Sequence, residues 1–194
     1  MEVKKLVLPL LFLSTMLAAQ NTFEKAKKLR ATATIAPGFL FEGGPVNIYL
    51  NGLLEYFPEE KVSLRGDSYF TLKSSDNTRV LNKNHSVMFG IMYHLNQNKK
   101  LAPFVGLQTG INFTELNKPL IGLQESVISP MLVIVPKTTV VPIVVLRVGE
   151  TIFIGNHFNI FYEFTYIKGK LNKNTYKPLN LDELRISFGL GFDI

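Results

Sequence analysis

Apolar and polar residues alternate along most of the chain after residue 30. At the carboxy end, for example, Leu184, Ile186, Phe188, Leu190, Phe192 and Ile194 alternate with Arg185, Ser187, Gly189, Gly191 and Asp193. Successive side chains of a β-strand point to opposite faces, so this period of two predicts strands with one apolar face and one polar or small face. The predicted strands are 31–41, 46–57, 61–72, 85–95, 101–113, 138–154, 158–170 and 183–194.

The connections between these strands alternate in length. The segments 58–60, 96–100 and 155–157 are short, whereas 73–84, 114–137 and 171–182 are long; only 42–45 is a short exception. Short periplasmic turns that alternate with longer external loops are typical of a membrane β-barrel. After residue 30 the chain has no apolar run long enough for a membrane-spanning helix. The pattern therefore predicts an all-β fold over 31–194, namely an eight-stranded antiparallel up-and-down β-barrel that crosses the membrane.

Charge decides which face points outward. The polar phase carries the mid-strand charges, three acidic and three basic: Glu55, Arg65, Asp67, Arg147, Glu163 and Arg185. The apolar phase is almost free of charge, and a Lys or Arg there would cost about 2–4 kcal/mol at the bilayer midplane. Glycine and serine are frequent on the polar phase. We therefore expect the six charges to form one ion-pair network that closes a narrow, side-chain-filled lumen.

The first residues have the layout of a secretory signal peptide. Lys4 and Lys5 precede an apolar run that ends in Ala18 and Ala19, which predicts a signal peptide over 1–19 and a periplasmic segment over 20–30. The run is shorter than the roughly 20 residues that a spanning helix needs. The chain has no cysteine, hence no disulfide, and its net charge is +6. Export argues against a nucleic-acid partner and favours anionic lipid head groups.

The last residues resemble a known assembly signal. Ser187, Gly189, Phe192 and Ile194 match the spacing with which bacterial transmembrane barrels end, although Ile stands at the last position instead of the commoner Phe. The mature chain therefore resembles the small outer-membrane β-barrel superfamily, porin-family-like, and its signal ending in Ala-Ala-Gln resembles those of Bacteroidota. The resemblance implies insertion into the outer membrane by the barrel-assembly machinery. We expect outer-membrane lipids and lipopolysaccharide as the other partners, and a monomer.

The chain offers little catalytic chemistry. Some outer-membrane barrels are lipid-modifying hydrolases that use a histidine with a serine and an acid, but His85 and Ser86 are adjacent and point to opposite faces. His94 and His157 are expected to be solvated near periplasmic turns. No histidines and carboxylates share metal-ligand spacing and no glycine loop fits a nucleotide, so no catalytic, metal or cofactor site is predicted.

Two further features bear on the barrel. Aromatic residues gather near both predicted membrane interfaces, among them Tyr56, Phe57, Tyr93 and Phe104 on the periplasmic side. Val141, Ile143 and Val145 are apolar on the inner phase, and Pro142 between them is expected to require a bulge or an extramembrane position.

Three function classes remain open. The first is an integral outer-membrane barrel with a structural or surface-interaction role, which is neither an open pore nor an enzyme. The second is a soluble periplasmic barrel of lipocalin type that binds an apolar ligand, and the third is the lipid-modifying hydrolase. The apolar segment 114–137 has no assigned role beyond extending its flanking strands.

Overall fold

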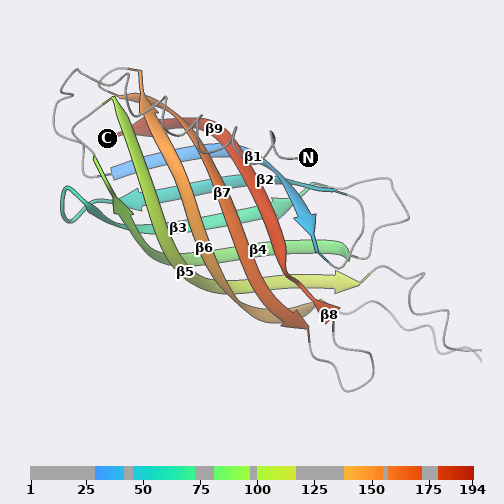
Figure 1. Cartoon of the computed structure of the whole chain (residues 1–194). Coiled ribbons are helices and arrows are strands. Elements are labelled where there is room, and N and C mark those ends of the chain that lie inside the picture. Colours follow the sequence, from blue (N-terminus) through green and yellow to red (C-terminus); the bar gives the residue numbers. More distant parts are fainter. Residues whose placement is uncertain are drawn as a thin grey trace, which may run out of the picture.

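The computed structural model describes residues 29–41, 46–72, 81–96, 100–116, 138–154, 157–171 and 179–194. The long strands in these residues are β1 (Leu29–Leu40), β2 (Asn47–Tyr56), β3 (Val62–Thr71), β4 (Leu81–His94), β5 (Leu101–Leu116), β6 (Thr139–Phe153), β7 (Phe158–Leu171) and β9 (Glu183–Asp193). Each pairs antiparallel with the next, and β9 pairs with β1 to close the barrel (Figure 1). The expected all-β, eight-stranded barrel is confirmed.

We call the two ends of the barrel external and periplasmic as the sequence predicts them. The strand boundaries agree with the predicted ones to within one residue, except at the start of β1, which begins at Leu29, and at the external ends of β4 and β5. Pairing there continues to Leu81 and Leu116, past a bulge between Leu81 and Lys83. Lys83 and Glu115 face each other across this extension in an ion pair of 2.8 Å. The two-residue β8 (Leu179–Asn180) pairs with the end of β7. The predicted signal peptide 1–19, the segment 20–28 and residues 117–137 of the apolar loop lie outside the described residues.

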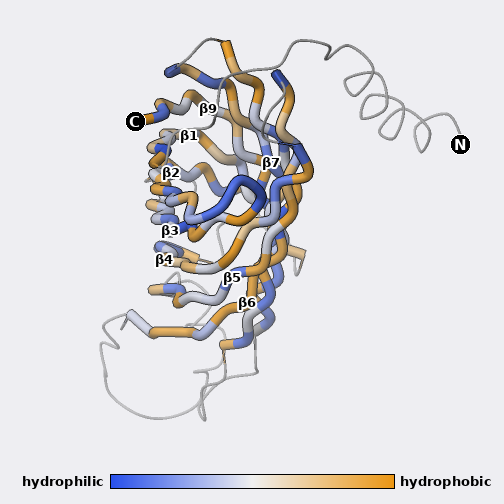
Figure 2. Tube along the Cα trace, turned by 90° about the vertical axis from the view of Figure 1, so that its left-hand side faces the viewer, coloured by the Kyte–Doolittle hydropathy of each residue, from blue (hydrophilic) through white to orange (hydrophobic). Residues whose placement is uncertain are grey.

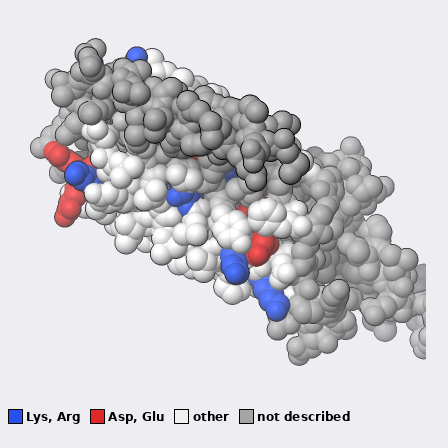
Figure 3. All heavy atoms as spheres, in the orientation of Figure 1, with Lys and Arg blue, Asp and Glu red and all other residues white. Residues whose placement is uncertain are grey.

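The two faces of the strands differ in exposure as the alternation predicted. The outer face carries large exposed apolar side chains, of which Phe188 is 62% and Leu190 66% exposed. The inward phase carries most of the buried polar and charged side chains. Hydropathy therefore alternates along each strand (Figure 2), and the described part of the face in Figure 3 is mostly uncharged, with a few acidic and basic side chains near its two ends and a basic one between them.

Strand β6 accommodates Pro142 without a bulge, so that alternative was wrong, and a position outside the membrane stays a prediction. Pro142 pairs in register with Ile111 of β5, and its neighbours Val141 and Ile143 are buried inside the barrel. Pairing of β6 with β7 starts only at Ile143, which lies opposite Gly169, so Pro142 pairs with β5 alone. Proline lacks an N–H donor, and the end of a ladder tolerates that loss.

The aromatic residues near the periplasmic end divide between the two faces. Tyr56 and Tyr93 are exposed on the outside, as the interface prediction requires, whereas Phe57 and Phe104 are buried inside the barrel. Phe104 lies on the inward phase of β5, and Phe57 turns inward just after β2 ends, 4.8 Å from the guanidinium of Arg30. The prediction was therefore wrong for Phe57 and Phe104, because proximity in sequence to a strand end does not decide which face a side chain takes.

Strands β4 and β5 approach so closely at position 90 that only glycine fits there. A Cβ there would lie 2.5 Å from Cα of Gln108, its cross-strand partner on β5, and would collide with the carbonyl of Leu107. We expect Gly90→Ala to lower the free energy of unfolding by about 1–3 kcal/mol, because the β5 backbone must move. The matched control is Gly52→Ala, where a Cβ meets no atom within 4 Å and a change of at most about 1 kcal/mol is expected. Urea unfolding of the folded barrel measures both, and equal losses would contradict the close-approach argument.

Candidate functional site

The interior of the barrel holds the candidate site. All six charged residues predicted to line the lumen lie inside it, and each is at most 3% exposed. They do not form the single network that was expected. The structure divides them among three clusters at different heights along the barrel, and it adds partners that the sequence analysis did not name.

The central cluster joins two arginines and two carboxylates from three strands. Arg65 contacts Asp67 at 2.8 Å on β3 and Glu163 of β7 at 3.0 Å. Arg147 of β6 pairs with the same Glu163 and lies 3.6 Å from Asp67. The formal charges of the four groups cancel, which is the arrangement that buried charges need.

Neutral groups complete the hydrogen bonds of the central cluster. Gln108 of β5 donates to Asp67 over 2.7 Å and accepts from Arg147 over 2.5 Å. The Tyr69 hydroxyl donates to Glu163 over 3.1 Å. Gln108 and Tyr69 were not predicted, although both lie on the polar phase of their strands, a signal that could have included them.

The external cluster is built around Arg185. This side chain contacts Glu183 at 2.7 Å, and its guanidinium carbon lies 3.9 Å from the centre of the Tyr49 ring. Glu183 accepts a hydrogen bond of 2.6 Å from the Tyr49 hydroxyl and one of 3.2 Å from Asn84. Arg185 therefore pairs with Glu183, a residue of its own strand that the predicted network omitted.

The periplasmic cluster contains Glu55, which was predicted to belong to a single network of all six charges. Its carboxylate lies 3.4 Å from Arg30 and 2.9 Å from Nε2 of His94. Arg30 also contacts Asp193 at 2.6 Å, and so links the first, second and last strands. The prediction omitted Arg30 because its strand began at residue 31. It also omitted Asp193, because it included mid-strand charges only, although Asp193 lies on the polar phase of its strand.

His94 is completely buried, so the expectation of a solvated histidine was wrong. It ends β4 on the inward phase, and its ring packs 5.1 Å from the Phe57 ring and 5.5 Å from the Phe104 ring. Its Nε2 lies 3.0 Å from the hydroxyl of Ser63, which donates to Glu55 over 2.5 Å. His157, by contrast, is exposed, as expected, in the connection that precedes β7.

The Ser63, His94 and Glu55 contacts do not make a catalytic triad. A triad needs the serine on one ring nitrogen and the acid on the other, so that the acid orients the imidazole while the ring takes the serine proton. Here both partners contact Nε2, and Nδ1 has no hydrogen-bond partner among the described residues. His85 accepts from the Thr71 backbone N–H, while Ser86 faces inward and accepts from Arg185, so this pair lies on opposite faces.

Apolar side chains separate and cover the charged clusters. Leu53, Met92, Phe104 and Phe161 pack together as one buried cluster, and the Phe104 and Phe161 rings also cover the Arg65 guanidinium. At the external end, Leu81, Val141, Leu171 and Leu181 form a second buried cluster with Leu40 against it. Side chains therefore fill the lumen at several heights, as the width of an eight-stranded barrel requires.

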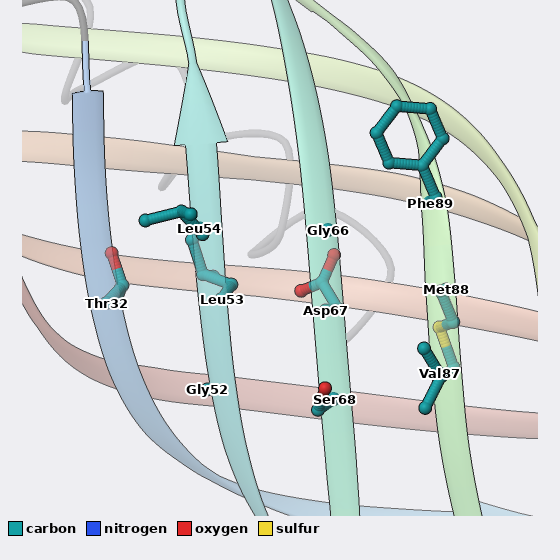
Figure 4. A pocket seen from close by; sticks show the side chains of 10 residues that line it. All are labelled: Thr32, Gly52, Leu53, Leu54, Gly66, Asp67, Ser68, Val87, Met88 and Phe89. Carbon is teal, nitrogen blue, oxygen red and sulfur yellow. The ribbon is translucent and has the colours of Figure 1, made fainter.

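The wall also carries a shallow hollow of about 500 Å³ on strands β1 to β4 (Figure 4). Outward-facing Leu54, Val87 and Phe89 rim it, and the missing side chains of Gly52 and Gly66 leave it open. Its lining is mostly apolar and offers no arrangement of acid, base or nucleophile on the outer face. The hollow is therefore no candidate for catalysis.

Within the described ranges, no group of three or more His, Cys, Asp or Glu residues could hold a metal ion. In the same part of the chain no helix is long and apolar enough to cross a membrane.

The C-terminal motif divides between the two faces of β9. Ser187 is fully buried and lies 3.3 Å from the Tyr69 hydroxyl, and Gly189 pairs with Thr34 across the closing seam. Phe192 and Ile194 are exposed on the outside. This placement leaves the apolar members of the motif accessible on the outer face, while its small members line the lumen.

Several solved structures have a similar fold, among them bacterial outer-membrane proteins. Neisserial surface protein A is 13% identical, with a TM-score of 0.61 over 86% of this chain and 96% of that one. The N-terminal β-barrel domain of OprF from Pseudomonas aeruginosa is 12% identical, with a TM-score of 0.57 over 87% and 99%. Ail, the attachment invasion locus protein of Yersinia pestis, is 11% identical, with a TM-score of 0.53 over 89% and 100%. The likeness is one of fold. No protein-family model matches the sequence, and no curated protein matches it either.

Proposed function

We propose that the protein is an integral outer-membrane barrel with a structural or surface-interaction role and a lumen closed to solutes. The observation that carries this proposal is the distribution of side chains, with large apolar residues outside and charges inside. Several large apolar side chains on the outside of the barrel are more than half exposed, among them Phe89, Phe188 and Leu190. Such a surface is unfavourable in water and favourable in contact with lipid. The similar folds of known outer-membrane barrels support the same location.

A soluble lipocalin-like barrel is not favoured, because such a barrel needs an apolar lumen for its ligand and a polar exterior. The described chain has the reverse arrangement, with Arg65, Arg147 and Glu163 buried at its centre. A hydrolase is not favoured either, because the contacts of His94 lack the geometry of a triad. The proposed partners are outer-membrane lipids, lipopolysaccharide and the barrel-assembly machinery that would recognise the end of β9.

Fractionation and gel mobility test the location. We expect the protein to sediment with outer membranes, to need detergent for extraction, and to migrate differently on a gel before and after boiling. Recovery of folded protein in the soluble periplasm would contradict the proposal. Since the chain has no cysteine, single-cysteine variants add a test of orientation: an impermeant thiol reagent on intact cells is expected to label Lys170→Cys and to leave Glu59→Cys unlabelled.

Conductance tests the closed lumen separately from location. The purified barrel in a planar lipid bilayer is expected to give no stable conductance steps, because the central cluster and the apolar clusters occupy its cross-section. Regular conductance steps from the folded wild-type protein would show an open pore. They would contradict the closed lumen and the structural role, but they would not contradict the membrane location.

A further inference from the structure

The outer wall of the barrel carries an acidic side chain among its apolar residues. Glu150 of β6 lies opposite Pro103 of β5 on one side and Tyr162 of β7 on the other. Tyr162 in turn lies opposite Phe188 of β9, which is 62% exposed on the outside. Residues that pair across an antiparallel sheet share a face. Glu150 therefore points away from the lumen and belongs to none of the three charged clusters.

The carboxylate of Glu150 has an incomplete set of partners. Its Oε2 accepts a hydrogen bond from the Tyr162 hydroxyl. Within the described ranges the side chain forms no ion pair, and its Oε1 accepts no hydrogen bond. The residue is only 1% exposed. Buried carboxylates need a cation close by, so Glu150 lacks the counter-ion that the acidic residues of the lumen have.

The unpaired oxygen of Glu150 is still open to the surroundings of the barrel. Oε1 is not among the unpaired polar atoms that the protein covers completely. Since the whole residue is so little exposed, the opening above this oxygen is narrow. A group that reaches Oε1 must therefore be slim as well as positively charged.

The position of Glu150 along β6 places it in the periplasmic half of the wall. Strand β6 ends three residues later at Phe153, and Ile154 and Phe158 next to this end are 60% and 62% exposed. Three residues span about 10 Å along a strand, which is about 8 Å of height at the usual strand tilt of about 40°. The head-group layer of one leaflet is about 5–8 Å thick. Glu150 therefore lies close to the level at which head groups meet hydrocarbon.

A second charge on the same side of the barrel limits how far Glu150 can stand outside the hydrocarbon. Lys168 of β7 is exposed and lies opposite Val144, six residues before Glu150 on β6. Six residues span about 20 Å along a strand and about 15 Å across the membrane at that tilt, whereas the apolar band of a membrane barrel is about 25 Å tall. Lys168 can extend its long side chain toward the external head groups. The shorter Glu150 cannot, so it needs a cation at the edge of the periplasmic leaflet.

We propose that Glu150 and Tyr162 bind the primary ammonium of a phospholipid head group in the periplasmic leaflet, an inference that rests on the proposed membrane location. The ammonium supplies the missing positive charge and donates a hydrogen bond to Oε1 of Glu150. The Tyr162 hydroxyl gives its own proton to Glu150, so its oxygen keeps lone pairs that accept a second hydrogen bond from the same ammonium. The head group thus takes the place that a basic side chain takes in the lumen.

Other occupants of this site fit less well. A trimethylammonium head group carries the charge but has no N–H to donate, and its methyl groups keep the charge farther from Oε1. A divalent cation would need several further oxygen ligands, and among the described residues no group of three or more His, Cys, Asp or Glu could hold a metal ion. An acyl chain alone would leave the carboxylate without a counter-ion.

Native mass spectrometry of the folded barrel tests the proposal. The wild-type protein is released from bilayers that contain equal amounts of ethanolamine and choline phospholipids with identical acyl chains. We expect about tenfold greater retention of the ethanolamine lipid, because only its ammonium can donate a charge-assisted hydrogen bond. Equal retention of the two lipids by the folded wild-type protein would overturn the proposal, and this result does not depend on whether any variant folds.

One substitution assigns the preference to this site. Glu150→Gln removes the charge but keeps the size of the side chain, so the preference for the ethanolamine lipid is expected to disappear. The matched control is Glu59→Gln, which removes an exposed acid from the turn after β2 and is expected to keep the wild-type preference. A preference that survives in folded Glu150→Gln would show that other residues select the lipid, and would overturn the assignment.

The lipid site and the membrane location can fail separately. A barrel that does not insert into these bilayers would contradict the proposed location. A barrel that inserts and retains both lipids equally would contradict the lipid site alone.

Discussion

Replacing Glu163 by glutamine is expected to lower the free energy of unfolding by about 3–5 kcal/mol. Glu163 is fully buried and is the carboxylate that Arg65, Arg147 and the Tyr69 hydroxyl share. Glutamine keeps the size of the side chain but removes its charge, so the two guanidinium groups are left with Asp67 alone. The large expected effect comes from a desolvated positive charge without a counter-ion, rather than from the loss of one attractive contact.

A double-mutant cycle measures the interaction free energy between Glu163 and Arg147, and so tests this explanation. Adding Arg147→Met to Glu163→Gln leaves Arg65 with Asp67 as a neutral pair, so the double variant is expected to lose less than the sum of the single losses. The control is Lys83→Met, since Lys83 is 51% exposed in its pair with Glu115 and is expected to contribute about 0–1 kcal/mol. Urea unfolding of the reconstituted barrel gives all four values. Strictly additive losses for Arg147 and Glu163 would show that the two charges do not depend on each other.

Phe188→Arg is expected to destabilise the barrel in a membrane by about 2–4 kcal/mol. Phe188 lies in the middle of β9, on the outer face, and is 62% exposed. An arginine there must enter the hydrocarbon, or draw water and head groups into it, wherever the midplane of the bilayer crosses the strand. The measurement is unfolding from lipid vesicles.

The same strand offers the control for depth. Phe192→Arg places the same charge on the same face but next to the periplasmic end of β9, where the cost is expected to fall to about 0–1 kcal/mol. An equal effect at both positions would mean that the exposed apolar face does not cross the membrane in the proposed orientation. A difference confined to vesicles, and absent in a uniform detergent micelle, would identify the bilayer as its cause.

The sequence by itself determined the strands, their two faces and the closure of the barrel. A β-strand repeats every two residues, so the alternation of Leu184 to Ile194 with Arg185 to Asp193 is enough to separate an apolar from a polar face. The absence of charge on the apolar phase then indicated that this face points outward. The alternation of connection lengths added the even number of strands. The alternation within a strand and the lengths of the connections both lie in the order of residues along the chain, so the sequence predicts them.

Only the tertiary structure decided which charges meet. Arg30 and Asp193 lie at opposite ends of the chain, yet they are 2.6 Å apart because β1 and β9 close the barrel. The buried position of His94 and the partition of the charges into three clusters depend in the same way on how neighbouring strands are displaced along one another. A period of two shows that a side chain points inward, but its height inside the lumen follows from the register and tilt of all the strands together. That geometry is a property of the closed sheet, so no single segment of the sequence contains it.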